Sequence, residues 1–255
     1  MIRIVVLLLV LALPAAAQTA AGTGAVAELR FPAGAGPHPA VVLLHGCSGI
    51  TPTVRRWAAR FAEWGYVALV ADSFGPRGVT NVCRARGEAL PAPGMPNPSA
   101  LSSAARLGDA FAAAATLRAR ADVRPDRVFL VGFSHGAGTA LMAATRPVVE
   151  RRGATPFRGV VAFYPWCPLA GAPLASPLLT LIGDADDWTP AERCRALWAS
   201  RARDPVEATL HVYPSATHAF DAPAPARGYL GHQLRHDPVA TEDAVGRVRA
   251  FLARE

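Results

Sequence analysis

The pentapeptide Gly132-Phe133-Ser134-His135-Gly136 constrains this chain more than any other feature. It fits the Gly-x-Ser-x-Gly pattern of a sharp strand-to-helix turn that holds a serine side chain exposed. The apolar stretch 128–131 before it predicts a strand, and the Ala-rich stretch 137–145 after it predicts a helix. The glycines remove Cβ atoms that so tight a turn cannot accommodate. We interpret Ser134 as a candidate nucleophile, the alternative being an ordinary Gly/Ser turn between two core elements.

A serine hydroxyl needs a base to activate it, and a histidine base needs an acid to orient it. Downstream of such a turn, the acid comes first along the chain and the histidine second. The strand predicted at 178–182 is followed by the acidic segment 184–187, and the strand predicted at 209–213 is followed by His218. Both groups are then expected at the carboxyl edge of the sheet, beside Ser134.

A negatively charged intermediate at the serine requires backbone N–H donors, which form an oxyanion hole. One donor is expected from His135, the residue after the nucleophile. The strand predicted at 40–44 leads into His45-Gly46-Cys47-Ser48-Gly49, where the glycines permit a close backbone approach. We assign the second donor to the N–H of Cys47, the alternative being a simple turn after the strand.

Together these segments resemble the dienelactone hydrolase family of α/β hydrolases. The matching segments are Val41-Val42-Leu43-Leu44-His45-Gly46, Gly65-Tyr66-Val67-Ala68-Leu69-Val70-Ala71-Asp72, Val131-Gly132-Phe133-Ser134-His135-Gly136, Gly183-x-x-Asp186-x-x-x-Pro190 and Tyr213-x-x-Ala216-x-His218-x-Phe220. The resemblance implies an α/β-hydrolase fold, with a mostly parallel central sheet and helices on both faces. The Gly-x-x-Asp-x-x-x-Pro spacing implies that Asp186 is the acid of the triad. Asp187 is then expected to face solvent or to cap the helix that starts near Pro190.

The chain departs from the family pattern at several positions. The namesake enzymes have a cysteine where this chain has Ser134, and a glutamate where it has Gly46. They bind the substrate carboxylate with two arginines. Arg77 is expected to replace one of them, and the segment 221–223 stands where the other would be. The pattern therefore favours a serine carboxylesterase acting on a small-molecule ester or lactone, through an acyl-enzyme intermediate.

Two tryptophans follow predicted strands and are candidates for the walls of the acyl pocket. They are Trp166 and Trp188, and ordinary core packing is the alternative for each.

The alternative functions for this scaffold are a polyester hydrolase, a peptidase or a non-catalytic periplasmic binding protein. The chain has no long extra domain of the kind that oligopeptidases of this fold carry, and its ordered triad residues argue against a binding protein.

The first 17 residues have the features of a cleavable signal peptide. A short basic start precedes ten apolar residues, 4–13, and Ala15-Ala16-Ala17 forms a cleavage site. We expect a periplasmic or secreted protein without a permanent membrane anchor, the alternative being that the segment stays uncleaved as an anchor. Residues 18–255 have the length of one α/β domain. Its helices are predicted at 53–64, 98–120, 135–145, 190–201 and 241–253, and the Pro-rich segment 90–98 is predicted to be a surface loop.

The formal net charge of +7 comes from arginine alone, because the chain contains no lysine. The arginines are scattered, and no basic stretch has interleaved aromatic residues, so no nucleic-acid partner is expected. His232 and His236 lack the glutamate of a zinc-protease motif, and the acidic segment 184–187 lacks the spacing of a calcium loop. No metal and no cofactor is expected. The oligomeric state stays open.

The four cysteines of an exported chain are expected to form two disulfides. Cys47 follows the strand ending at residue 44, and Cys83 follows the strand ending at residue 71. Cys167 and Cys194 likewise follow two strands that are expected to be neighbours in the sheet. Because neighbouring loops can bring two Cα atoms within about 7 Å, we predict the pairs Cys47–Cys83 and Cys167–Cys194, the alternative being four buried free thiols.

Overall fold

The structure, a computed structural model, describes residues 26–87, 103–168, 171–201 and 204–255. The predicted signal peptide, 1–17, and the predicted Pro-rich loop, 90–98, lie outside the described residues. Within the part of the chain that is described, no helix is both long enough and apolar enough to cross a membrane.

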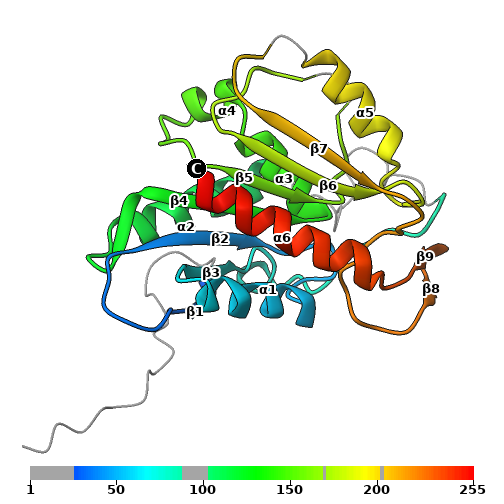
Figure 1. Cartoon of the computed structure of the whole chain (residues 1–255), viewed down its shortest axis with the longest axis horizontal. Helices are drawn as coiled ribbons and strands as arrows, with labels where there is room; N and C mark the ends of the chain where they lie inside the picture. The colour runs from blue at the N-terminus through cyan, green and yellow to red at the C-terminus, as the bar shows by residue number, and fades with distance from the viewer. Residues whose placement is uncertain (1–25, 88–102, 169–170, 202–203) are drawn as a thin grey trace, which may run out of the picture.

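A seven-stranded sheet forms the centre of the molecule (Figure 1). Its strands are β1 (Val26–Arg30), β2 (His38–Leu44), β3 (Val67–Ala71), β4 (Val123–Phe133), β5 (Val160–Phe163), β6 (Leu178–Gly183) and β7 (Ala208–Tyr213). Their spatial order is β1-β3-β2-β4-β5-β6-β7, and all neighbours are parallel except β1 and β3. The inner strands are apolar without alternation because helices cover both faces of the sheet.

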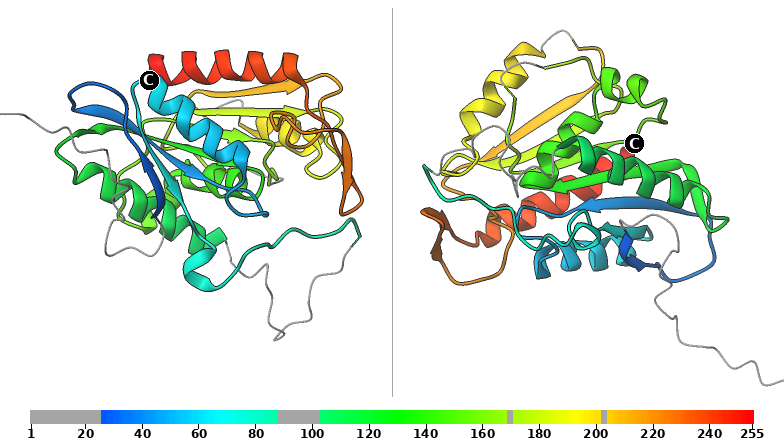
Figure 2. Two further views of the ribbon diagram at one scale, coloured as in Figure 1. Left: turned by 90° about the horizontal axis from the view of Figure 1, so that it is seen from below. Right: turned by 180° about the vertical axis from the view of Figure 1, so that it is seen from behind.

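Two helices cover one face of the sheet, and three cover the other (Figures 1 and 2). The first face carries α1 (Pro52–Glu63) and α6 (Pro238–Arg254), and the second carries α2 (Ser103–Arg118), α3 (His135–Ala143) and α5 (Ala191–Ser200). In α1, the Thr51 side chain caps the first turn, and Trp57 and Phe61 are buried four residues apart against the sheet. The layered α/β-hydrolase fold predicted from the sequence is confirmed.

Some elements were not predicted. The helix expected over 135–145 ends earlier, and a short helix, α4 (Arg146–Arg151), follows it, because the backbone at Thr145 is extended. The hairpin of β8 (Arg227–Tyr229) and β9 (His232–Leu234) was also missed, because each strand has only three residues. Leu234 of this hairpin pairs with His218, which places the hairpin beside the loop after β7 (Figure 1).

Both predicted disulfides are present. Cys47–Cys83 joins the loop after β2 to the loop after β3, and Cys167–Cys194 joins the loop after β5 to the start of α5. The pairs form because β2 lies beside β3 and β5 lies beside β6, so the loops at their carboxyl ends are adjacent. Two disulfides in a chain of this size indicate an oxidising compartment outside the cytosol.

Candidate active site

Ser134 occupies a strained turn between β4 and α3. Its φ of 52° and ψ of −114° lie outside the regions that a serine ordinarily adopts. A Cβ at Gly132 would overlap the backbone of Gly136, and a Cβ at Gly136 would overlap the backbone of residues 44 and 45. Glycine is therefore required on both sides of the serine for β4, α3 and the loop after β2 to pack this closely.

The three residues of the predicted triad meet at the carboxyl edge of the sheet. His218 Nε2 lies 2.9 Å from Ser134 Oγ, and His218 Nδ1 lies 2.7 Å from Asp186 Oδ2. The side chains of His218 and Asp186 are almost fully buried, whereas Ser134 borders a cavity. This is the arrangement in which a carboxylate orients an imidazole toward a hydroxyl.

Asp186 is held by donors that the sequence analysis did not identify. Its Oδ1 accepts hydrogen bonds from the backbone N–H groups of Trp188 and Thr189, at 2.9 and 2.8 Å. Thr189 Oγ1 donates to Asp186 Oδ2 at 2.8 Å and lies 3.2 Å from His218 Nδ1. A threonine three residues after an aspartate is typical of a side-chain-capped turn, and that spacing was the available signal.

The structure separates Asp187 from the triad, as expected, but gives it another role. Asp187 neither caps α5 nor simply faces solvent. Its Oδ2 forms an ion pair with Arg86 at 2.7 Å, and its Oδ1 lies 3.4 Å from Nδ1 of His232. Asp187 thus joins the loop after β3 to the β8–β9 hairpin, a long-range contact that no local spacing reveals.

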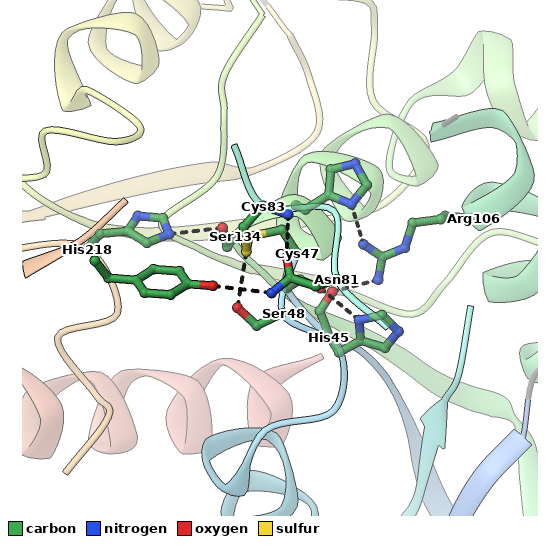
Figure 3. The surroundings of a disulfide bond; sticks show 11 residues. His45, Cys47, Ser48, Asn81, Cys83, Arg106, Ser134 and His218 are labelled. Carbon is green, nitrogen blue, oxygen red and sulfur yellow. Dashed lines mark hydrogen bonds between the residues drawn. A yellow bond between two sulfur atoms is a disulfide. The ribbon is translucent and has the colours of Figure 1, made fainter. Parts of the chain in front are cut away.

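The two residues assigned to the oxyanion hole flank Ser134. His135 is the first residue of α3, and Cys47 lines the same cavity as Ser134. A Cβ at Gly46 would lie 3.5 Å from the Phe133 carbonyl oxygen and from the Cβ of Ser134, so the loop after β2 packs closely against the turn. The disulfide to Cys83 (Figure 3) holds this loop from the other side, and so does a 2.9 Å hydrogen bond from Val82 N–H to the Cys47 carbonyl.

Two imidazoles behind the site are neutral, and their hydrogen bonds identify the tautomers. His45 Nε2 accepts from the Ser73 N–H at 3.3 Å, so Nδ1 carries the proton and donates to the Gly46 carbonyl at 2.8 Å. His135 Nδ1 accepts from the Arg106 guanidinium at 2.7 Å, which places the His135 proton on Nε2. Burial first, and the nearby Arg106 charge second, lower the pKa of each imidazole to about 4.

We expect the free energy of unfolding to decrease as the pH falls from about 6.5 to about 4. In this window the unfolded chain protonates His45 and His135, whereas the folded chain does not, so protons favour unfolding. The loss amounts to about 3 kcal/mol for each imidazole at the acidic end of the window. Urea unfolding at about pH 7 and about pH 4.5 measures it.

The variant His45→Asn is the matched comparison for this pH dependence. Its amide keeps a donor for the Gly46 carbonyl but cannot titrate, so its stability is expected to depend less steeply on pH than that of the wild type. Equal pH dependence in the two proteins would contradict the assignment.

A cavity of about 440 Å³ opens at Ser134. Trp188 forms part of its wall, with its ring stacked at 4.4 Å on His232 and 5.8 Å from the ring of Tyr229. The wall is completed by the first turn of α1, the loop after β7 and the β8–β9 hairpin. This cavity therefore depends on the hairpin that the sequence analysis missed.

Two residues predicted to bind substrate lie away from this cavity. Arg77 donates to both carboxylate oxygens of Asp109 at 2.9 Å and to the Ser73 carbonyl at 2.7 Å, so its guanidinium is already engaged. Trp166 is 52% exposed, and Arg193 lies over its ring at 4.1 Å. Neither residue lines the cavity, and both predictions are corrected by the long-range packing of their side chains.

A buried carboxylate occupies the place where the family pattern has a second arginine. Asp221 accepts from Trp57 Nε1 at 2.8 Å and from the Tyr164 hydroxyl at 2.9 Å. Burial raises the pKa of Asp221 in spite of these donors, and it also raises the pKa of Tyr164 well above its usual value. The Tyr164 ring packs edge-on at 4.8 Å against His218, so this group supports the loop that carries the histidine.

Among the described residues, no three His, Cys, Asp or Glu side chains are arranged to hold a metal ion.

Known proteins resemble this chain over nearly all of its described length. The sequence model of the dienelactone hydrolase family matches residues 26–255. A protein of Bradyrhizobium sp. named "Probable 2-oxo-3-(5-oxofuran-2-ylidene)propanoate lactonase" is 28% identical over 78% of this chain and 80% of its own. A "Putative carboxymethylenebutenolidase" of Methylorubrum extorquens is 30% identical over 75% of this chain and 66% of its own.

A solved structure shows the same fold. The crystal structure of a putative dienelactone hydrolase from Klebsiella pneumoniae superimposes with a TM-score of 0.68 at 21% identity, covering 89% of this chain and 92% of that one. The family match spans the strained serine turn, the triad geometry and the cavity described above. The chain therefore belongs to the dienelactone hydrolase family and is a carboxylic ester hydrolase with the α/β-hydrolase fold.

Proposed function

We propose that this protein hydrolyses a carboxylic ester or lactone through a Ser134–His218–Asp186 triad and an acyl-enzyme intermediate. The observation that carries the proposal is the hydrogen-bonded series from Ser134 Oγ through both nitrogens of His218 to Asp186, at the edge of a cavity. Ser134 attacks the carbonyl carbon while His218 Nε2 takes the hydroxyl proton and later donates it to the leaving oxygen. In the second half-reaction, His218 takes a proton from a water molecule, which attacks the acyl carbon, and returns a proton to Ser134 Oγ as the acid leaves.

The backbone N–H groups of Cys47 and His135 are the proposed oxyanion donors. Each such donor is worth about 3 kcal/mol of barrier in comparable enzymes. The carboxylate of Asp186 stabilises the imidazolium that forms on His218, and the bonds from Trp188 and Thr189 keep this carboxylate fixed. The Asp186 carboxylate therefore does not have to move as positive charge develops on His218.

Labelling by a fluorophosphonate probe tests the proposal. We expect stoichiometric labelling, with the adduct located on Ser134 by peptide mass spectrometry, together with turnover of p-nitrophenyl esters or simple lactones. A non-catalytic binding protein would remain unlabelled. Labelling without turnover of any small ester would favour the polyester hydrolase or peptidase alternatives.

Two arginines favour a substrate that carries a carboxylate. Arg56, on α1, and Arg227, on β8, line the cavity, and neither forms an ion pair within the described residues. Among the described residues, the side chain of Arg56 donates to Thr53 Oγ1, at 2.9 Å. The named lactonase relative acts, by its name, on a lactone with a propanoate group. We therefore infer that the acid-bearing end of the substrate lies between these guanidinium groups, which replace the mispredicted Arg77.

The substitutions Arg56→Met and Arg227→Met are each expected to lower kcat/KM about tenfold for mono-p-nitrophenyl glutarate. A charge-assisted hydrogen bond contributes roughly 1.5 kcal/mol, which corresponds to such a factor. The kcat/KM for p-nitrophenyl valerate, which lacks the carboxylate, should change by less than about twofold, because the substitution then removes no contact with the substrate. Steady-state kinetics with both esters measure the difference.

The matched control is Arg55→Met. Arg55 is the neighbour of Arg56 on α1, but it points to Glu28 at 3.3 Å and does not line the cavity. This variant should treat both esters as the wild type does. Equal losses on the charged and the neutral ester in the cavity variants would refute the carboxylate inference.

We further propose that residues 1–17 are a cleavable signal peptide and that the protein acts in the periplasm or outside the cell. The two disulfides support this location, because they require an oxidising compartment to persist. N-terminal sequencing of the protein recovered from a periplasmic extract is expected to begin at Gln18.

A further inference from the structure

Arg106 is a buried cation, and the carboxylates that act on its charge, those of Asp109 and Asp72, lie beyond ion-pair distance. Arg106 lies on α2, its side chain is fully buried, and no described carboxylate lies within ion-pair distance of its guanidinium. Asp109, one turn further along the helix, is engaged by Arg77 instead. The Nε of Arg106 has no hydrogen-bond partner among the described residues. Burying an arginine in this way is costly for folding, so its retention calls for another explanation.

The two arms of the guanidinium reach the two sides of the proposed oxyanion hole. Nη2 donates to the carbonyl oxygen of His45 at 2.6 Å, two residues before Cys47. Nη1 donates to Nδ1 of His135 at 2.7 Å, the residue whose backbone N–H is the other proposed donor. Figure 3 shows Arg106 next to His45, on the opposite side of the site from His218.

Of the three side chains Arg106, His45 and His135, Arg106 is the one that carries a charge at neutral pH. The imidazoles of His45 and His135 are held neutral by burial and by Arg106 itself, whereas Arg106 remains protonated at neutral pH because its own pKa is lowered only to about 10. The Phe74 ring, 5.4 Å from the guanidinium carbon, shields it on one side. A fixed positive charge is thus buried behind the position where negative charge develops.

We propose that Arg106 is a positioning residue for the oxyanion hole: its guanidinium holds the loop after β2 and the serine turn at the separation that a tetrahedral intermediate requires. The proposal rests on the function proposed above. Because Arg106 holds the two segments whose backbone N–H groups bind only the oxyanion, its loss raises the barrier to reaction without weakening the binding of the ground-state ester.

Replacing Arg106 tests this role. Arg106→Met keeps the length and apolar stem of the side chain but removes both donors, and we expect kcat per titrated active site to fall about 10²-fold, with KM within about threefold. Arg106→Lys keeps the charge, but its single ammonium cannot reach both acceptors, so an intermediate loss is expected. The affinity for a trifluoromethyl ketone, which forms an oxyanion with the serine, should fall by the same factor as kcat/KM.

Arg118→Met is the matched control. Arg118 lies on the same helix, donates to the carbonyl oxygens of Pro125 and Pro156, and has an aromatic ring below its guanidinium, but it lies outside the cavity. This substitution is expected to lower the melting temperature and to leave kcat and the ketone affinity unchanged.

Several outcomes would overturn the proposal. They are wild-type kcat in either Arg106 variant, equal kcat losses in Arg106→Met and Arg118→Met, and a loss confined to KM. If Arg106→Met does not fold, Arg106→Lys alone decides, because kcat is counted per serine titrated by the fluorophosphonate. A wild-type protein that is not labelled at Ser134 would instead refute the proposed function.

Discussion

Ser134→Ala is expected to lower ester turnover by about 10⁶-fold, the usual loss for the nucleophile of a triad. The fold should survive, because alanine meets the same strain at a φ of 52° that serine already bears, and the Ser134 N–H bond to the Phe163 carbonyl is a backbone contact. Initial rates on a p-nitrophenyl ester measure turnover, and the melting temperature reports the fold.

A second cavity serine provides the control for this experiment. Ser48 also lines the cavity, but its hydroxyl lies 3.1 Å from the Cys83 sulfur and not beside a histidine. Ser48→Ala should keep its rate within a few-fold of the wild type. Ser134→Ala activity within tenfold of the wild type would remove Ser134 from the mechanism.

Asp186→Asn is expected to lower turnover by roughly 10⁴-fold, because it stabilises the wrong tautomer of His218. The backbone N–H groups of Trp188 and Thr189 both point at Oδ1, so the amide oxygen of asparagine must take that position. Its NH2 group then faces His218 Nδ1, which has to act as an acceptor. The imidazole proton moves to Nε2, and the imidazole can no longer accept the proton of Ser134.

The neighbouring aspartate is the control for this substitution. Asp187→Asn weakens only the half-exposed pair with Arg86 and the contact with His232, so turnover should stay within a few-fold of the wild type. Kinetics of the two variants on one ester, side by side, decide the assignment. If Asp187→Asn is the inactive protein, the acid of the triad lies one residue further along the loop than Asp186.

Much of the site could be predicted because each of its residues lies in or soon after a strand or turn that is recognisable from the local sequence. The glycines around Ser134 report a turn whose close backbone contacts exclude any Cβ. Asp186 lies three residues after β6 and His218 five residues after β7, and parallel strands bring their carboxyl ends to one edge. The same neighbour relation explains why both disulfide pairs could be predicted from the order of the strands.

Local patterns in the sequence were sufficient to predict the parallel strands, most of the helices and the serine turn, and the spacing shared with the family identified Asp186 as the acid of the triad. The tertiary structure alone decided which arginine does what: Arg77 pairs with Asp109, Arg56 and Arg227 reach the cavity, and Arg106 is buried behind the serine turn. The reason is physical. Backbone periodicity and glycine sterics act over a few residues, whereas the partner of a long charged side chain is set by groups 30 or more positions away that only packing brings within reach.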